Sequence, residues 1–453
     1  MYDEEEIELF VPTTKQVPED IRKLMSKGES ALEKILDKEM TFRLFRSSEP
    51  TIVKYFVDNS DKLLELAFDK SESKNELGAK AFAILEHSQA DLTRAILSHQ
   101  SLHRHAVDTI QDTVVSQNLL FINRLTSLTL AVFYFDPVAA TRSCGYLMQL
   151  LSLLSEPTVL SLFETLCSGN FENREVVQGW LIEMGFPEII YNEIDSCQPN
   201  TDCTHYSKEA NYIYSLFRIV CFCGTSPILG PKFCTPNFVK ALNLNVGGFS
   251  EFIEYQRWET LTALYCEKTK ESMRGLFPIA TEIIRDEHLI KTRAGVAALE
   301  LLSLMLNFDG DVFTSFFLTM DISNVIINAI ISNSSHTHLH FAALEYFRYA
   351  FMNQQLMSEL WKTIPEIIMN NFKENNHCLR CVMYKLFKLF LKAAKSKTKI
   401  IQNVRSDKTV ENFLRGPFTK YREIKNRYYG DFAVFTHDNA KEMAQQIIQN
   451  MGL

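Results

Sequence analysis

The residues best able to do chemistry are histidines and cysteines that recur at short spacing. His336, His338 and His340 alternate in the segment SSHTHLH. On an extended loop, alternate imidazoles can meet at one metal ion. However, no acid or cysteine lies near them in the sequence, and His340 enters a predicted helix. We therefore interpret this segment as a polar turn between two helices rather than as a metal site.

A second group is rich in thiols and consists of Cys197, Cys203, His205, Cys221 and Cys223. Zinc sites usually contain paired C-x2-C knuckles, which this spacing lacks. Farther along, HCLRC at 377–381 offers half of such a site without the other half. We interpret both groups as core thiols. The sequence therefore predicts neither a metal nor another cofactor.

Enzyme motifs are missing as well. The chain contains no P-loop, no G-x-G-x-x-G after a strand, no G-x-S-x-G elbow and no H-E-x-x-H. The sequence thus predicts a protein that binds partners rather than an enzyme.

The elements that position these residues are predicted to be helices. Segments 292–307 and 338–352 each carry apolar residues at i, i+3, i+4 and i+7, so each has one apolar face. These residues are Ala298, Leu301, Leu302 and Met305 in the first segment and Ala343, Tyr346, Phe347 and Ala350 in the second. A helix with such a face must bury it against neighbouring helices. Because the pattern recurs with short connections, it predicts an all-α, armadillo- or HEAT-like helical solenoid of irregular repeats.

The chain is predicted to divide into three parts. Residues 1–16 are typical of a flexible acidic arm, residues 17–395 form the helical-repeat domain, and residues 396–453 form a more polar tail. A last helix is expected at 439–450. Glycines and prolines at 223–236 indicate a hinge or an insertion. The polar stretches 196–206 and 332–340 are predicted to be surface loops, which often bind partners.

Charge and composition narrow the class of protein further. The 453 residues carry a formal net charge of −8, whereas proteins that bind nucleic acid normally show a basic face. The best candidate for a membrane span, 118–135, is interrupted by Asn123 and Arg124, which favours a buried core helix. The ten cysteines lack regular spacing, as is typical of reduced thiols. We therefore expect no nucleic-acid partner, no membrane insertion, and a cytoplasmic location that can extend to the nucleus.

Several sequence blocks occur in a consistent order between residues 30 and 352. The first is LEKILDKEMTFRLFRSSEPTIVKYF at 32–56, and the second combines DPV at 136–138, CGY at 144–146 and SEPTVLSLFETL. The third contains VQGWLIE, with Trp180, and then SKEANYIYSLFR; the fourth begins at Thr292-Arg293 and ends at Leu339-His340. In this order, the blocks resemble the SAPS-domain family, regulatory subunits of a type-six (Sit-four-like) Ser/Thr protein phosphatase.

The chain departs from the family pattern in places, so it resembles a divergent member. It lacks the H-I-G-T-S residues, and of the N-N-F-L-H motif it keeps only Leu339 and His340. The resemblance implies a non-catalytic scaffold that binds the phosphatase catalytic subunit, with a further scaffold subunit as an additional partner, and directs substrate choice.

The predicted partner-binding residues are His336, His338, Leu339 and His340, in the turn at 332–340, and Trp180, which matches a family motif. The alternative interpretation is an armadillo-like adaptor that binds peptides or cargo in transport or trafficking.

Overall fold

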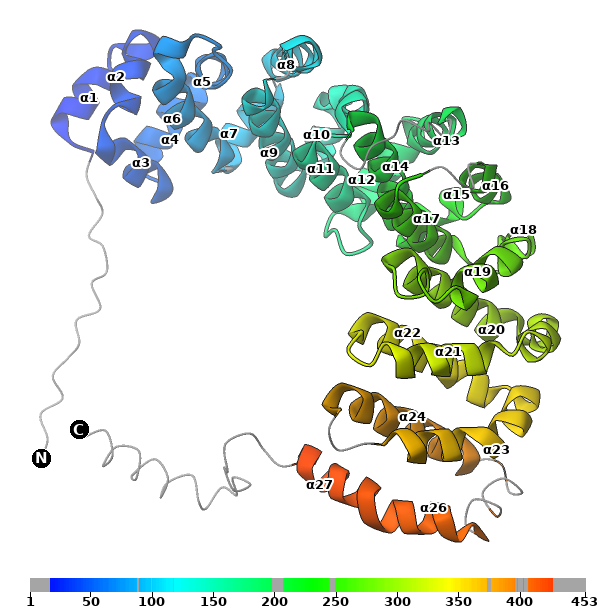
Figure 1. The fold of residues 1–453 in the computed structure, drawn as a ribbon. Helices are drawn as coiled ribbons and strands as arrows, with labels where there is room; N and C mark the ends of the chain where they lie inside the picture. Colours follow the sequence, from blue (N-terminus) through cyan, green and yellow to red (C-terminus); the bar gives the residue numbers. More distant parts are fainter. Residues whose placement is uncertain are drawn as a thin grey trace, which may run out of the picture. The chain divides into compact units, whose positions relative to one another are not determined.

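The computed structural model describes residues 17–87, 89–98, 100–116, 118–197, 207–244, 249–372, 376–395, 397, 402 and 406–426. Across these ranges the chain folds into helices joined by short connections and forms no β-strand (Figure 1). The predicted all-α helical solenoid is therefore confirmed. The predicted N-terminal arm and the helix expected at 439–450 lie outside the described residues.

The contacts within the chain divide it into two compact units, one ending at Phe277 and one beginning at Pro278. The helices of the first unit are α1 (Glu19–Met25), η1 (Gly28–Ala31), α2 (Leu32–Leu36), α3 (Glu39–Arg46), α4 (Pro50–Asp58), α5 (Ser60–Ala67), η2 (Glu72–Lys74), α6 (Asn75–Glu86), α7 (Ala90–Ser98), α8 (Ser101–Ser116), α9 (Leu119–Phe135), α10 (Pro137–Ser143), η3 (Gly145–Leu153), α11 (Pro157–Cys167), α12 (Arg174–Glu183), α13 (Phe186–Ser196), α14 (Lys208–Thr225), α15 (Gly230–Phe233), α16 (Pro236–Leu244), α17 (Glu251–Leu264) and α18 (Lys270–Met273).

The division between the units falls within α19 (Leu276–Arg285). The remaining helices are α20 (Arg293–Thr319), α21 (Ile322–Ser332), α22 (Thr337–Met352), α23 (Gln354–Asn371), α24 (His377–Lys395), α26 (Lys408–Phe413), η4 (Leu414–Phe418) and α27 (Thr419–Asn426).

Acid-proline pairs start several of these helices. The Glu49 carboxylate accepts a hydrogen bond from the backbone N–H of Ile52 at 2.8 Å, and Pro50 occupies the first turn of α4. Asp136 serves α10 in the same way, through the N–H of Ala139 at 3.0 Å. Proline suits this position because a first-turn N–H has no partner within the helix.

Large side chains interlock in the core of each unit. In the first unit α14 packs against α17, and the Thr260 hydroxyl donates to the Phe217 carbonyl at 2.8 Å across that interface. In the second unit α20 packs against α22, and the ring of Tyr346 lies 5.7 Å from that of Phe317. The buried Tyr346 hydroxyl is satisfied by Ser323 at 2.8 Å, which avoids an unpaired polar group in the core.

The stretch predicted as a hinge or an insertion, 223–236, is instead closely packed. It continues α14 and then forms the short helix α15, and Leu229 and Phe233 are fully buried. The Ser226 hydroxyl donates to the buried Gln178 side chain of α12 at 2.6 Å. This hydrogen bond ties the corner between α14 and α15 to the preceding helices.

A close approach of α5, α6 and α9 shapes the N-terminal part of the first unit. A Cβ atom on Gly78 of α6 would lie 2.9 Å from the Leu66 carbonyl oxygen of α5, so the two helices meet where Gly78 has no side chain. Arg124 of α9 is only 7% exposed and donates to the Ala67 carbonyl at 2.6 Å. A cation at this place satisfies an unpaired carbonyl at the end of α5 and complements the helix dipole.

Segment 118–135 therefore forms the buried core helix that the sequence predicts. Among the described helices, none alone has the length and apolar composition to cross a membrane. Only α20 and α21 taken together meet these criteria, and they are bent by 69° with respect to each other.

Candidate functional site

The histidines at 336–340 have different surroundings. His336 caps α22, because its Nδ1 accepts from the Leu339 N–H at 3.1 Å and its Nε2 therefore donates to the Lys291 carbonyl at 2.8 Å. His340 is buried, its Nε2 contacts the Asn333 carbonyl at 3.1 Å, and burial lowers its pKa. Only His338 is exposed.

Of the predicted partner-binding set, His336, Leu339 and His340 thus have roles within the fold. Leu339 is fully buried. Replacing all the histidines of the turn together would remove a helix cap and a buried hydrogen bond, and would lower stability whatever the effect on a partner. His338 is the histidine of this turn whose replacement tests binding alone.

Trp180 lies in α12, far along the chain from that turn. Its side chain is half-buried and its ring centroid lies 5.8 Å from that of Phe133. The exposed part of the indole can still reach a partner, and the rest packs between α9 and α12.

The predicted thiol cluster is described only in part, since Cys203 and His205 lie outside the described residues. Burial raises the pKa of Cys221 to about 11 and that of Cys223 well above the ordinary value. Both thiols therefore remain protonated near neutral pH, which disfavours nucleophilic attack because that reaction needs the thiolate. No group of three or more His, Cys, Asp or Glu in the described parts of the chain is placed to hold a metal ion.

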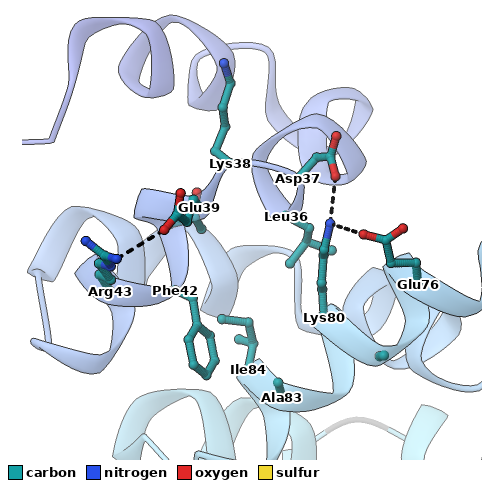
Figure 2. Close-up of a pocket in the computed structure, with 12 residues that line it drawn as sticks. Leu36, Asp37, Lys38, Glu39, Phe42, Arg43, Glu76, Lys80, Ala83 and Ile84 are labelled. Carbon is teal, nitrogen blue, oxygen red and sulfur yellow. Dashed lines mark hydrogen bonds and ion pairs between the residues drawn. The ribbon is translucent and has the colours of Figure 1, made fainter.

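An open groove between α3 and α6 is a stronger candidate site (Figure 2). Its volume is about 560 Å³. Its apolar residues are Leu36, Phe42, Ala79, Ala83 and Ile84, and we call it the apolar groove. Because the two alanines end at Cβ, the face of α6 is hollow opposite the Phe42 ring.

The depth of the apolar groove comes from its buried floor. Leu36 and Ile84 are buried, whereas Phe42 and Ala83 are half-buried and line its walls. In Figure 2 the Phe42 ring from α3 faces Ile84 and Ala83 of α6. An apolar side chain of a partner would therefore be enclosed by apolar atoms on both sides.

Charged residues form the rim of the apolar groove, and most of them are paired with one another. Lys80 contacts Asp37 at 2.7 Å and Glu76 at 2.8 Å, and Arg43 contacts Glu39 at 3.1 Å (Figure 2).

These pairs also perturb the titration of their members. The hydrogen bond from Lys80 lowers the pKa of the Asp37 carboxyl, and the two acids raise the pKa of Lys80. The rim therefore carries balanced charge, which favours a partner with an apolar anchor over a strongly charged one.

Part of the apolar groove could have been found in the sequence. Ala79 and Ala83 are four residues apart, and they place small residues on one face of a predicted helix. What the pattern does not reveal is that this face lies opposite Phe42, since the neighbour of a helix in space is decided by packing.

Comparison with known proteins gives little further information. No family model and no curated protein matches the chain. Among solved structures it is similar to an engineered protein determined by a structural genomics consortium. The sequence identity is 11%, the TM-score is 0.39, and the match covers 82% of this chain and 93% of that chain.

Proposed function

We propose that this chain is a non-catalytic regulatory subunit that binds the catalytic subunit of a type-six-like Ser/Thr protein phosphatase. The observation that carries the proposal is the location of the first SAPS-like block, 32–56. This block forms α2, α3 and α4, and its residues Leu36 and Phe42 line the apolar groove. The resemblance and the surface feature thus coincide in one segment.

The other SAPS-like blocks support the proposal differently. The apolar residues of VQGWLIE and of the helix after Thr292 are largely buried in α12 and α20. Their similarity to the family is thus accounted for by packing of the scaffold. The first block supplies a surface for a partner in addition to a core.

The proposed mechanism is tethering. The scaffold holds the catalytic subunit through the apolar groove and presents substrates from its other surfaces, which raises the local substrate concentration at the phosphatase active site. Substrate choice then depends on what the scaffold binds, and the phosphatase supplies the chemistry.

The test is an affinity pull-down from native lysate, with mass spectrometry and a phosphatase assay on the eluate. The wild-type chain is compared with Ala83→Arg, which fills the apolar groove. Ala131→Arg is the matched control, since Ala131 is also a half-exposed helical alanine in the first unit. Thermal melts check that both variants fold.

We expect a near-stoichiometric phosphatase catalytic chain with the wild type and with Ala131→Arg. Loss of one buried apolar anchor costs about 1.5–3 kcal/mol, so capture by Ala83→Arg should fall roughly tenfold or more. Equal capture by Ala83→Arg would move the contact away from the apolar groove. If the wild type captures no phosphatase but instead cargo or coat proteins, the adaptor function replaces the regulatory one.

A further inference from the structure

A second cavity, of about 680 Å³, lies beside α7, α8 and α10 in the first unit. Its arginines form no ion pair with a described residue, whereas Arg43 and Lys80 of the apolar groove are paired. Arg104 and His103 line it from α8, and Arg142 lines it from α10. Asp61 of α5 is the acid in its wall. We call it the cationic cavity.

The hydroxyl groups around the cationic cavity already donate to the protein. Ser101 donates to the Asp61 carboxylate at 2.5 Å, and Ser143 donates to the Leu97 carbonyl at 2.8 Å. Ser98 donates to the Ala95 carbonyl at 2.7 Å. These bonds satisfy the acid and fix the wall, so the serines do not compete for the arginines.

The arginines, in contrast, are uncommitted. Arg104 and Arg142 are exposed, and neither forms a hydrogen bond or an ion pair with any described residue. The Gln100 side chain at the edge of the cavity has no such partner within the described ranges either. Each guanidinium carries five N–H donors and no acceptor. The unpaired N–H donors of these arginines therefore favour a ligand rich in acceptor oxygens.

The walls of the cationic cavity are held in place. The hydrogen bond from Ser143 joins α10 to α7, and α8 packs against η3. The His103 ring lies 6.0 Å from the buried Tyr146 ring, whose hydroxyl contacts Thr129 at 2.8 Å. A rigid wall reduces the ordering cost of binding, which favours a small ligand group.

We propose that the cationic cavity binds the phosphate monoester of a phosphorylated protein segment. Two guanidinium forks match a tetrahedral dianion, whereas a carboxylate is satisfied by one fork. The first-turn N–H groups of α8 also have no partner within the helix and lie at the same end as the cavity.

A phosphorylated protein fits the surroundings better than a membrane surface. Asp61 is in the cavity wall, Asp108 follows Arg104 by one helical turn, and the chain carries a net charge of −8. Membrane surfaces are recognised by broad clusters of basic residues. A local pair of arginines within mixed charge instead selects one phosphate group.

Phosphate binding at the cationic cavity does not require the phosphatase partner, because this cavity is separate from the apolar groove. It can be measured on the purified chain alone. If the chain regulates a phosphatase, the cationic cavity is a place where a phosphorylated substrate can dock. If it does not, the cationic cavity still predicts a phosphate-dependent partner.

The experiment measures binding of the full chain to a pool of short peptides with a central phosphoserine and degenerate flanks. The comparison pool carries serine at the centre. The variants are Arg104→Gln and Arg142→Gln, singly and together. The control is Arg22→Gln with Arg422→Gln, which removes two exposed arginines that likewise have no described partner. Vesicles with and without a phosphoinositide form the third arm.

We expect the wild type and the control to prefer the phosphoserine pool. Each single variant should bind it roughly tenfold more weakly, the loss typical of one charge-assisted hydrogen-bonding group. Equal binding of both pools, or wild-type affinity in the double variant, would overturn the proposal. Arginine-dependent binding to phosphoinositide vesicles without binding to the peptides would overturn it in favour of a lipid headgroup.

Discussion

The apolar groove and the cationic cavity belong to the same unit but treat charge in opposite ways. Around the apolar groove, Lys80 and Arg43 are paired with acids of the rim, and the space they surround is lined by carbon. Around the cationic cavity, Arg104 and Arg142 have no partner among the described residues. Among the described residues, the packing of helices has therefore produced one site with paired cations and one site with unpaired arginines.

The difference shows how a surface can be assigned a ligand class. A charge already paired within the protein contributes little to a new partner, because binding exchanges one pair for another. An unpaired guanidinium in a fixed wall contributes more, because no internal pair must be broken. Hydrophobic burial should thus dominate at the apolar groove and charge-assisted hydrogen bonds at the cationic cavity.

The largest expected effect is a crossed pair of losses. Ala83→Arg should reduce phosphatase capture roughly tenfold or more and leave phosphopeptide binding unchanged. The double variant Arg104→Gln with Arg142→Gln should weaken phosphopeptide binding and leave phosphatase capture unchanged. Pull-down and peptide binding measured on the same preparations test this. If either variant impairs both activities equally at unchanged melting temperature, the two sites are not separate.

Gly78→Ala should lower stability and affect the apolar groove selectively. The added Cβ would lie 2.9 Å from the Leu66 carbonyl and 3.2 Å from the Arg124 guanidinium, so α6 must shift. We expect a loss of about 1–3 kcal/mol in the free energy of unfolding, together with weaker phosphatase capture. Chemical denaturation and pull-down measure the two effects.

The control for Gly78→Ala is Gly179→Ala in α12, where no atom lies within 4 Å of the added Cβ. This change should stabilise the protein by about 0.5–1 kcal/mol, as expected for alanine in a helix interior. Similar destabilisation by the two variants would mean that Gly78 does not mark a close contact.

Mild acid should affect α8 before it affects the rim of the apolar groove. Burial lowers the pKa of His105, with a smaller contribution from Arg104, while Glu65, Asp108 and Asp61 oppose the shift. The unfolded chain then binds more protons than the folded one, so stability falls as the pH drops through the unfolded value of 6.5. The pKa of Asp37 is lowered below 3.8, so its contribution is lost only as the pH falls below that value.

Hydrogen exchange between pH 7 and pH 5 measures this difference. Protection should decrease in α8 and be retained in α3 and α6. Burial also lowers the pKa of His340, so the protection of α22 should decrease over the same pH range. His105→Gln should flatten the pH dependence of α8 exchange and leave that of α22 intact. A profile unchanged by this variant would assign the pH dependence to other groups.

The smallest expected effect is that of Lys80→Met. It removes the pairs with Asp37 and Glu76 while keeping the length of the side chain. Because surface pairs contribute little, the melting temperature should change hardly at all. Phosphatase capture should change less than with Ala83→Arg. A loss as large as that of Ala83→Arg would show that the rim charges, rather than the apolar floor, hold the partner.

Much of the fold could be predicted from the sequence, because helical periodicity reports which face of each segment is buried. The predicted segment 292–307 lies within α20, which continues to Thr319 beyond a kink at Asp309, where φ is −125° and ψ is 33°. The turn before α22 lies where SNSSH indicates it. The stretch at 223–236 was predicted to be a hinge or an insertion but is closely packed. Glycines and prolines allow tight packing as readily as a hinge.

The sites were less accessible to sequence reasoning, because they depend on which helices become neighbours. Nothing in the sequence places Phe42 opposite Ala83, or brings Arg104 and Arg142 to one cavity. The polar turn was predicted to bind through its histidines, yet His336 caps α22 and His340 is buried. The spacing of polar residues cannot distinguish a side chain that faces solvent from one that satisfies a nearby backbone group.

The most direct test of the proposed regulatory function is reconstitution from purified components. The full chain is mixed with a purified type-six-like phosphatase catalytic subunit, and the mass of the species in solution is measured. The proposed function predicts a one-to-one complex that forms with wild type and Ala131→Arg and is weakened with Ala83→Arg. Separate masses for the two proteins at concentrations that saturate a specific complex would contradict it.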